Sequence, residues 1–269
     1  MLVYTLSHLT KHPSNWSVKL CSIAAGTLLL SGQVLSAAAS DAWSGNFSIG
    51  FNNVAGNKDS NDLSVALKLA HNEKFQQHSP YRHTFEVNAE VEKTKTTDPN
   101  GQEITDKTRD NKSAAYTLGY FLDQQSYLEG DLQYAQDQIL GMEEFKAVGA
   151  KYNRKVVDNP THKFLIGAGL LYADLEYTDA SKERDKGVGG KLSYDYTGKL
   201  TNTVSFTQNT LLQAMSGVKY AVIDSGLSYA LTKNMSINLN HKVTYLSKPI
   251  SGNSEKASNV TDIKLKVDF

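Results

Sequence analysis

The chain has 269 residues, balances 28 basic against 28 acidic side chains, and contains a single cysteine. This balance provides no strongly basic surface, so we expect no nucleic-acid partner. One cysteine also excludes a framework of intrachain disulfides.

The first 39 residues have the features of a secretory signal peptide. Two lysines precede a largely apolar run, residues 20–35, and four small residues, 36–39, follow it. The run is too short and too often interrupted by polar residues to cross a membrane as a helix. We therefore predict a cleaved signal peptide at residues 1–39 and one domain at residues 40–269. Removal of the signal takes away two basic residues and no acidic one.

From Trp43 onward, apolar and polar side chains alternate with the period of two that is typical of β-strands. The first strand places Phe47, Ile49 and Phe51 on one face and serine and asparagine on the other. The pattern recurs at residues 63–69, 85–92, 113–122, 128–134, 148–153, 164–172, 188–196, 204–206, 218–231, 235–245 and 260–269. The chain therefore contains twelve expected strands. Residues 218–231 change parity midway, which predicts a β-bulge near Asp224.

The connections alternate in length. Short links at residues 123–125, 158–160, 197–199 and 232–234 alternate with longer polar segments at 95–109, 137–142, 178–186 and 248–256. Outer-membrane barrels have short periplasmic turns, longer external loops and, in bacteria, an even number of strands. Since an open sheet edge leaves backbone groups unpaired in hydrocarbon, the strands must close into a ring.

We therefore predict an all-β, transmembrane, antiparallel up-and-down β-barrel. It would be a monomer in the outer membrane of a Gram-negative cell, surrounded by outer-membrane lipid, with both termini in the periplasm. A soluble two-sheet β-protein is the alternative fold.

The last expected strand ends abruptly on an aromatic residue. Leu265, Val267 and Phe269 share the apolar face, and the intervening residues are charged. A terminal phenylalanine on the apolar face resembles the C-terminal signal by which outer-membrane barrels are recognised for insertion. The resemblance implies that the barrel assembly machinery is a partner and that these three residues form the assembly signal.

Short motifs also resemble a known family. The opening Trp43-Ser44-Gly45-Asn46-Phe47, then Gly50-Phe51 and Gly56-Asn57, are similar to the YdiY-like salt-induced outer membrane proteins, as is the final stretch Lys264 to Phe269. The similarity extends over the mature chain. The family is a domain of unknown function, so the resemblance implies the fold, the location and a link to salt or osmotic stress. It supplies no catalytic residue.

Candidates for chemistry are few. The sequence contains no convincing set of a nucleophile with a base or of paired acids, so we predict no enzyme and no cofactor. We expect His71, His83 and His162 on the outer face near turns, as part of an interfacial belt rather than a metal site. His241 is expected on the lipid face, or else marks an error in the expected register of its strand.

The inward parity carries charges of both signs. The acidic residues are Glu86, Glu90, Glu129 and Asp131, and the basic residues are Lys68, Lys242, Lys264 and Lys266. Either these groups cross the lumen as ion pairs that plug it, or they line a narrow aqueous path. Small residues on the same parity, at Gly167, Gly169, Ala173 and Gly189, leave space or make room for long side chains from another wall.

Three functions follow from these patterns. The first is a narrow, porin-like path for solutes or ions, or a stress-linked envelope protein. The second is a structural or adhesive barrel with a plugged lumen, and the third is a barrel hydrolase. No sequence feature identifies a substrate.

Overall fold

The structure is a computed structural model that describes residues 43–54, 59–75, 78–97, 102–138, 140–179, 184–215, 217–248 and 256–269. The expected signal peptide lies outside these residues, as do residues 98–101 of the expected third-to-fourth-strand loop. Within the described ranges, no helix is long and apolar enough to span a membrane.

The described residues form twelve strands. They are β1 (Trp43–Val54), β2 (Asp59–Phe75), β3 (His78–Thr97), β4 (Glu103–Phe121), β5 (Ser126–Asp137), β6 (Met142–Asp158), β7 (His162–Tyr177), β8 (Asp185–Lys199), β9 (Val204–Met215), β10 (Val218–Ala230), β11 (Met235–Leu246) and β12 (Ala257–Asp268). Each strand pairs antiparallel with its neighbours in sequence, and β12 pairs with β1. The predicted closed barrel of twelve strands is therefore confirmed.

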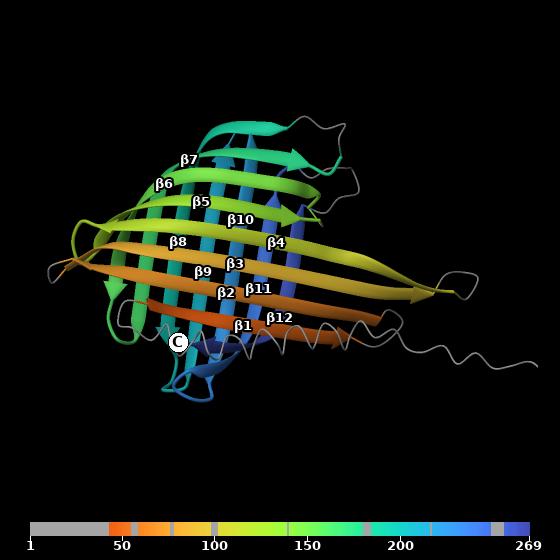
Figure 1. Ribbon diagram of the computed structural model, residues 1–269, viewed down its shortest axis with the longest axis horizontal. Coiled ribbons are helices and arrows are strands. Elements are labelled where there is room, and N and C mark those ends of the chain that lie inside the picture. Colours follow the sequence, from red (N-terminus) through yellow and green to blue (C-terminus); the bar gives the residue numbers. More distant parts are fainter. Residues whose placement is uncertain are drawn as a thin grey trace, which may run out of the picture. The chain divides into compact units, whose positions relative to one another are not determined.

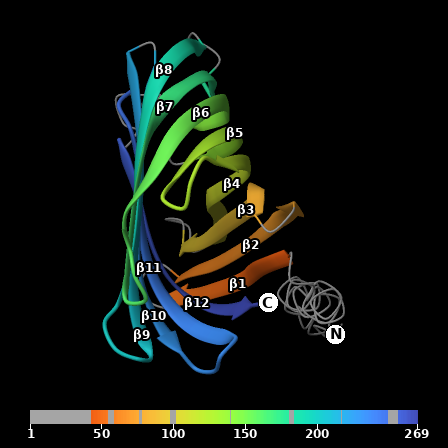
Figure 2. The ribbon, with the colours of Figure 1, turned by 90° about the vertical axis from the view of Figure 1, so that its left-hand side faces the viewer.

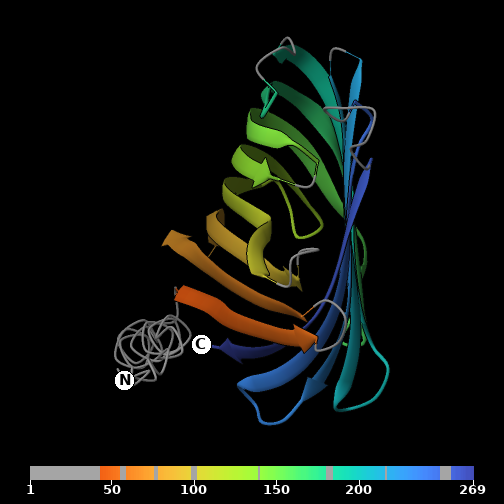
Figure 3. The same ribbon diagram turned by 90° about the vertical axis from the view of Figure 1, so that its right-hand side faces the viewer.

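The two walls of the barrel run in different directions. In Figure 1 the near wall, β1 to β6, crosses the view from side to side, while β8 to β11 run steeply behind it. Figures 2 and 3 show the same barrel from its sides, with β2 and β3 opposite β8 and β9. We call the end that holds Trp43 and Phe269 the turn end and the opposite end the loop end. Strong strand tilt is expected of a closed barrel.

Alternation places apolar side chains outside. On the outer face Leu170 is 66% exposed, Val188 71% and Ile263 59%. Their sequence neighbours on the other parity face the lumen, where Leu171 is 3% exposed and Lys264 has a side chain 16% exposed. The structure thus has an apolar exterior and a crowded interior.

The expected bulge near Asp224 is wrong. β10 keeps a continuous register with β9 and β11, from Val218 to Tyr229 and from Tyr220 to Ala230 respectively. The parity changes because Val218 and Tyr220 point into the lumen and meet other apolar side chains there. Apolar residues on the inward face therefore produced the same sequence pattern as a β-bulge would.

The suspected register error at His241 is also wrong. β11 pairs with β12 without interruption, and His241 stands on the outer face beside Thr261. Its Nδ1 lies 2.8 Å from the Thr261 hydroxyl, so the polar ring has a partner on the neighbouring strand.

Two connections between strands differ from those expected from the sequence: one is shorter and the other lies further along the chain. β3 and β4 remain paired as far as Thr97 and Glu103, so most of segment 95–109 is strand rather than loop. Residues 197–199 belong to β8, and the turn follows at 200–203. Backbone pairing extends the strands here because polar side chains do not prevent ladder hydrogen bonds.

Candidate functional site: the barrel lumen

The predicted lumen charges lie on the inner face, but most pair locally. Lys68 Nζ lies 3.3 Å from Glu86 on the adjacent strand. On β12, Lys264 pairs with Asp262 at 2.9 Å and Lys266 with Asp268 at 2.8 Å. One predicted arrangement required the two β12 lysines to form ion pairs with the acids of β5 across the lumen. They do not form these pairs.

One predicted pair does cross the lumen. Lys242 Nζ on β11 lies 3.6 Å from Glu90 Oε1 on β3. β11 and β3 are separated by β12, β1 and β2 around the ring, so this contact is a chord across the barrel.

The acids of β5 pair with two lysines that sequence reasoning did not select. Glu129 lies 3.2 Å from Lys151 on β6, and Asp131 is bonded to Lys191 on β8. The side chains of Asp131 and Lys191 are only 3% and 1% exposed. Both lysines lie on the inward parity of their strands, so parity could have identified them as lumen residues.

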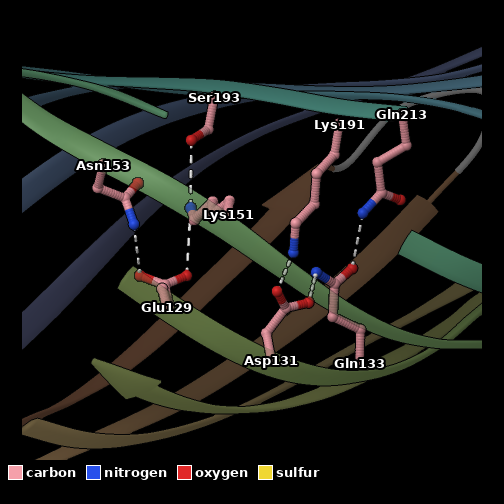
Figure 4. Close-up of polar contacts among 8 residues, drawn as sticks. All are labelled: Glu129, Asp131, Gln133, Lys151, Asn153, Lys191, Ser193 and Gln213. Carbon is pink, nitrogen blue, oxygen red and sulfur yellow. Dashed lines mark hydrogen bonds and ion pairs between the residues drawn. The ribbon is translucent and has the colours of Figure 1, made fainter. Parts of the chain in front are cut away.

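A polar network spans the lumen around these pairs (Figure 4). Gln133 donates to Asp131 over 2.7 Å and accepts a 3.0 Å hydrogen bond from Gln213 Nε2 on β9. Lys151 also donates to the Ser193 hydroxyl on β8 over 3.1 Å. Because β5 is not adjacent to β8 or β9, nor β6 to β8, these contacts join parts of the wall that are not neighbours around the ring.

Glycines make room for this network. A Cβ on Gly149 would lie 2.6 Å from Lys191 Nζ, and one on Gly167 would lie 2.7 Å from the Ser193 hydroxyl. A Cβ on Gly169 would lie 2.6 Å from the Lys151 Cβ. Around the predicted small residues the structure shows close packing rather than open space, but at Gly167, Gly169 and Gly189 the nearest atoms belong to the neighbouring strands β6, β8 and β9 and not to another wall.

Apolar side chains pack together inside the lumen toward the loop end, on the side of β6 to β11. We call this group the lumen plug; it consists of Leu140, Met142, Phe145, Ala147, Leu171, Ala173, Leu175, Tyr177, Met215, Val218 and Leu246. The ring centroids of Phe145 on β6 and Tyr220 on β10 are 5.3 Å apart. Rings from strands this far apart around the barrel meet only through its interior. Burial of each large apolar side chain contributes about 1.5–3 kcal/mol.

One feature of the sequence did indicate the plug, although a search for strict alternation of apolar and polar residues passes over it. From Phe164 to Leu175, apolar residues occupy both parities of one strand. A strand buried on both faces has such a continuous apolar run. The inner apolar face of β7 could therefore have been predicted, although its partners on β6, β9, β10 and β11 could not.

The three histidines each lie beside an aromatic ring of a neighbouring strand, and their place in an interfacial belt stays a prediction. His71 and His83 are cross-strand neighbours, and the ring of Trp43 lies tilted beside that of His71 with the centroids 4.5 Å apart. His83 Nδ1 lies 2.7 Å from the Tyr116 hydroxyl. Among the residues whose placement is described, no three His, Cys, Asp or Glu side chains are grouped so as to hold a metal ion.

The terminal residue closes the ring. Phe269 exchanges two backbone hydrogen bonds with Gly45, of 2.9 and 3.0 Å. A Cβ on Gly45 would lie 2.8 Å from the Phe269 ring, so the glycine admits the terminal aromatic side chain. Leu265 and Val267 continue the same seam opposite Ile49 and Phe47.

Twelve antiparallel strands in a closed ring, apolar outside and polar or tightly packed inside, define the class of up-and-down β-barrels. The chain belongs to the family described as "Protein of unknown function, DUF481", which it matches over residues 47–269. This membership confirms the family resemblance found in the sequence. No curated protein matches the chain.

Several solved structures are similar to this chain. The NanC porin is 9% identical with a TM-score of 0.42, covering 83% of this chain and 97% of its own. The translocator domain of the autotransporter NalP from Neisseria meningitidis is 10% identical with a TM-score of 0.45, covering 92% and 97%. An outer membrane channel from Pseudomonas putida is 9% identical with a TM-score of 0.48, covering 85% and 95%.

Proposed function

We propose that this protein is an integral outer-membrane barrel whose lumen is closed by its own side chains, so that it serves the envelope as a structural element rather than as an open pore. The observation that carries the proposal is the lumen plug. Side chains from β6, β7, β9, β10 and β11 meet inside the barrel, and the polar network of β5 braces the space beside them.

The membrane location rests on the distribution of side chains. Leu192 and Ile237 are 57% and 42% exposed on the outer face, where a soluble protein would bury them. In hydrocarbon, a ring of twelve paired strands satisfies backbone groups that an open sheet would leave unpaired. Outer-membrane lipid would surround this belt.

Orientation and assembly are part of the proposal. The turn end, which holds both ends of the barrel domain, would face the periplasm, because short turns are periplasmic in bacterial barrels. The seam of Leu265, Val267 and Phe269 would be recognised by the barrel assembly machinery. The protein would be a monomer, since closure of the ring leaves no sheet edge along most of its circumference.

Conductance in a planar bilayer tests the closed lumen. Wild-type protein should insert without steady currents. Leu171→Ala, which removes a plug side chain that is 3% exposed, should produce small, salt-dependent currents. Its matched control is Leu170→Ala, the neighbouring residue on the outer face, which should stay silent. Steady wild-type currents whose ion preference changes in Glu90→Gln or Glu129→Gln would contradict the closed barrel.

A narrow path for ions or small solutes is the second candidate, and one observation favours it. The side chains of Lys68 and Glu86 are 46% and 40% exposed although they face the interior. Part of the lumen on the β2 and β3 side is therefore solvated. The link to salt or osmotic stress implied by the family resemblance stays a prediction, and growth of a deletion strain at raised salt tests it.

A further inference from the structure

The connection between β5 and β6 packs into the barrel. From the sequence we expected residues 137–142 to form a polar segment outside it, yet Leu140 is 0% exposed and Met142 2%. Both side chains belong to the lumen plug, and Leu140 is the one plug residue that lies between strands rather than in a strand. We call Leu140, Gly141 and Met142 the lid, because this connection is at the loop end of the lumen.

The strand pairing is interrupted on both sides of the lid. The register of β5 with β6 shifts between Ala135 and Asp137, and the register of β6 with β7 shifts between Met142 and Glu144. Gly141 has a φ of 63°, in the left-handed region that favours glycine. A segment between two register shifts lacks the continuous ladder of a strand interior. It can therefore open locally while the strands of the wall stay paired.

Hydrogen bonds to single groups hold the lid in place. Thr178 donates to the Gly141 carbonyl oxygen twice, from its backbone N–H over 3.1 Å and from its hydroxyl over 3.2 Å. The backbone N–H of Leu140 donates to Asp137 Oδ1 over 3.1 Å. Each such bond contributes only modestly to stability in water, so a few of them form a latch that can break and reform.

Leu175 shows how a fixed part of the plug differs from the lid. It is also 0% exposed and belongs to the same plug. However, Leu175 lies within β7, opposite Phe145 of β6 and Asp185 of β8. Exposure of Leu175 requires two strand pairs to separate, whereas exposure of Leu140 requires only the lid to move. The two leucines therefore distinguish a local opening from an opening of the whole barrel.

We propose that the lid is a movable part of the plug, and that it uncovers the loop end of the lumen while the twelve-stranded ring stays closed. Burial of Leu140 favours the closed state, so the open state is a minority at equilibrium. The inference rests on the closed lumen of the proposed function and names the part of that closure that moves.

Thiol labelling measures the opening. The one cysteine of the chain lies in the predicted signal peptide, so Leu140→Cys and Leu175→Cys each give a mature barrel with a single thiol. In the purified barrel, a charged methanethiosulfonate reagent should modify Leu140→Cys at least about tenfold faster than Leu175→Cys. Heat-modifiable gel mobility shows that each variant is folded before it is labelled. Equal rates, or no labelling at either position, would overturn the lid.

The latch has its own variant and control. Thr178→Val removes the hydroxyl hydrogen bond to Gly141 and keeps the shape of the side chain. It should raise the labelling rate of Leu140→Cys about fivefold, the equivalent of one typical hydrogen bond, and leave that of Leu175→Cys unchanged. Thr161→Val removes a 3.0 Å hydroxyl hydrogen bond at the turn end and should change neither rate. Equal effects of the two valines on Leu140→Cys would contradict the latch.

Amide hydrogen exchange measures the same motion without a thiol. In the unmodified barrel, the N–H of Leu140 donates to the Asp137 side chain, whereas Leu175 lies inside a strand. The Leu140 amide should exchange at least about tenfold faster than the Leu175 amide. Equal protection of the two amides would show that the lid does not open by itself, even if a cysteine variant fails to fold.

Conductance in a planar bilayer separates this inference from the proposed function. A charged adduct on Leu140→Cys cannot return to the apolar plug, so small currents should appear after labelling and not before. Silence after complete labelling would show that the lid does not close the lumen, and its proposed role would be wrong. Steady currents from unlabelled wild-type protein would instead contradict the closed lumen of the proposed function.

Discussion

The buried pair of Asp131 and Lys191 should be the most sensitive charge pair of the lumen. Asp131→Asn leaves the ammonium of Lys191, whose side chain is 1% exposed, without its counterion. Breaking a buried pair by removal of one partner costs about 3–5 kcal/mol. We expect a loss of this size in the free energy of unfolding, because the short carboxamide of the variant carries no charge to offset the buried cation.

The double variant Asp131→Asn, Lys191→Met should recover most of this loss, since it removes both charges and their desolvation cost. The matched control is Glu86→Gln. Glu86 and its partner Lys68 are 40% and 46% exposed, so its loss should stay below about 1 kcal/mol.

Urea unfolding in lipid vesicles measures these differences through the fluorescence of Trp43, which is the one tryptophan beyond the predicted signal. A loss in the free energy of unfolding for Asp131→Asn no larger than that for Glu86→Gln would refute the role of the buried Asp131–Lys191 pair. Strictly additive effects in the double variant would also refute it.

Three further outcomes are expected. Gly45→Ala should lower the yield of heat-modifiable barrel, since its Cβ would lie 2.6 Å from the Lys68 carbonyl oxygen and 2.8 Å from the Phe269 ring. Gly130→Ala should not, since the nearest atom to its Cβ is 4.0 Å away. Deletion of Phe269 should reduce membrane levels without reducing synthesis; unchanged membrane levels would contradict its role in assembly. The hydrogen bond from the Ser126 hydroxyl holds the pKa of Asp123 below its ordinary 3.8. The stability that this hydrogen bond gives the folded barrel is therefore present above that pH and is lost as the pH falls below it. Ser126→Ala should raise the pKa in a carboxyl NMR titration.

Most of the fold could be predicted from the sequence because strand alternation is a local property. Each strand needs one apolar face against lipid, so residues such as Phe47 and Ile49 identify a strand and its outer side without knowledge of its partners. Failures occurred where the inner face is also apolar, as at Val218 and Tyr220, since two apolar faces remove the period of two.

The contents of the lumen were decided by tertiary structure. Parity places Asp131 and Lys191 inside, but they are 60 residues apart, and only the tilt and stagger of β5 and β8 bring them together. The same holds for Phe145 against Tyr220. A local pattern specifies which face a side chain occupies, whereas its partner across a barrel depends on how the whole ring closes.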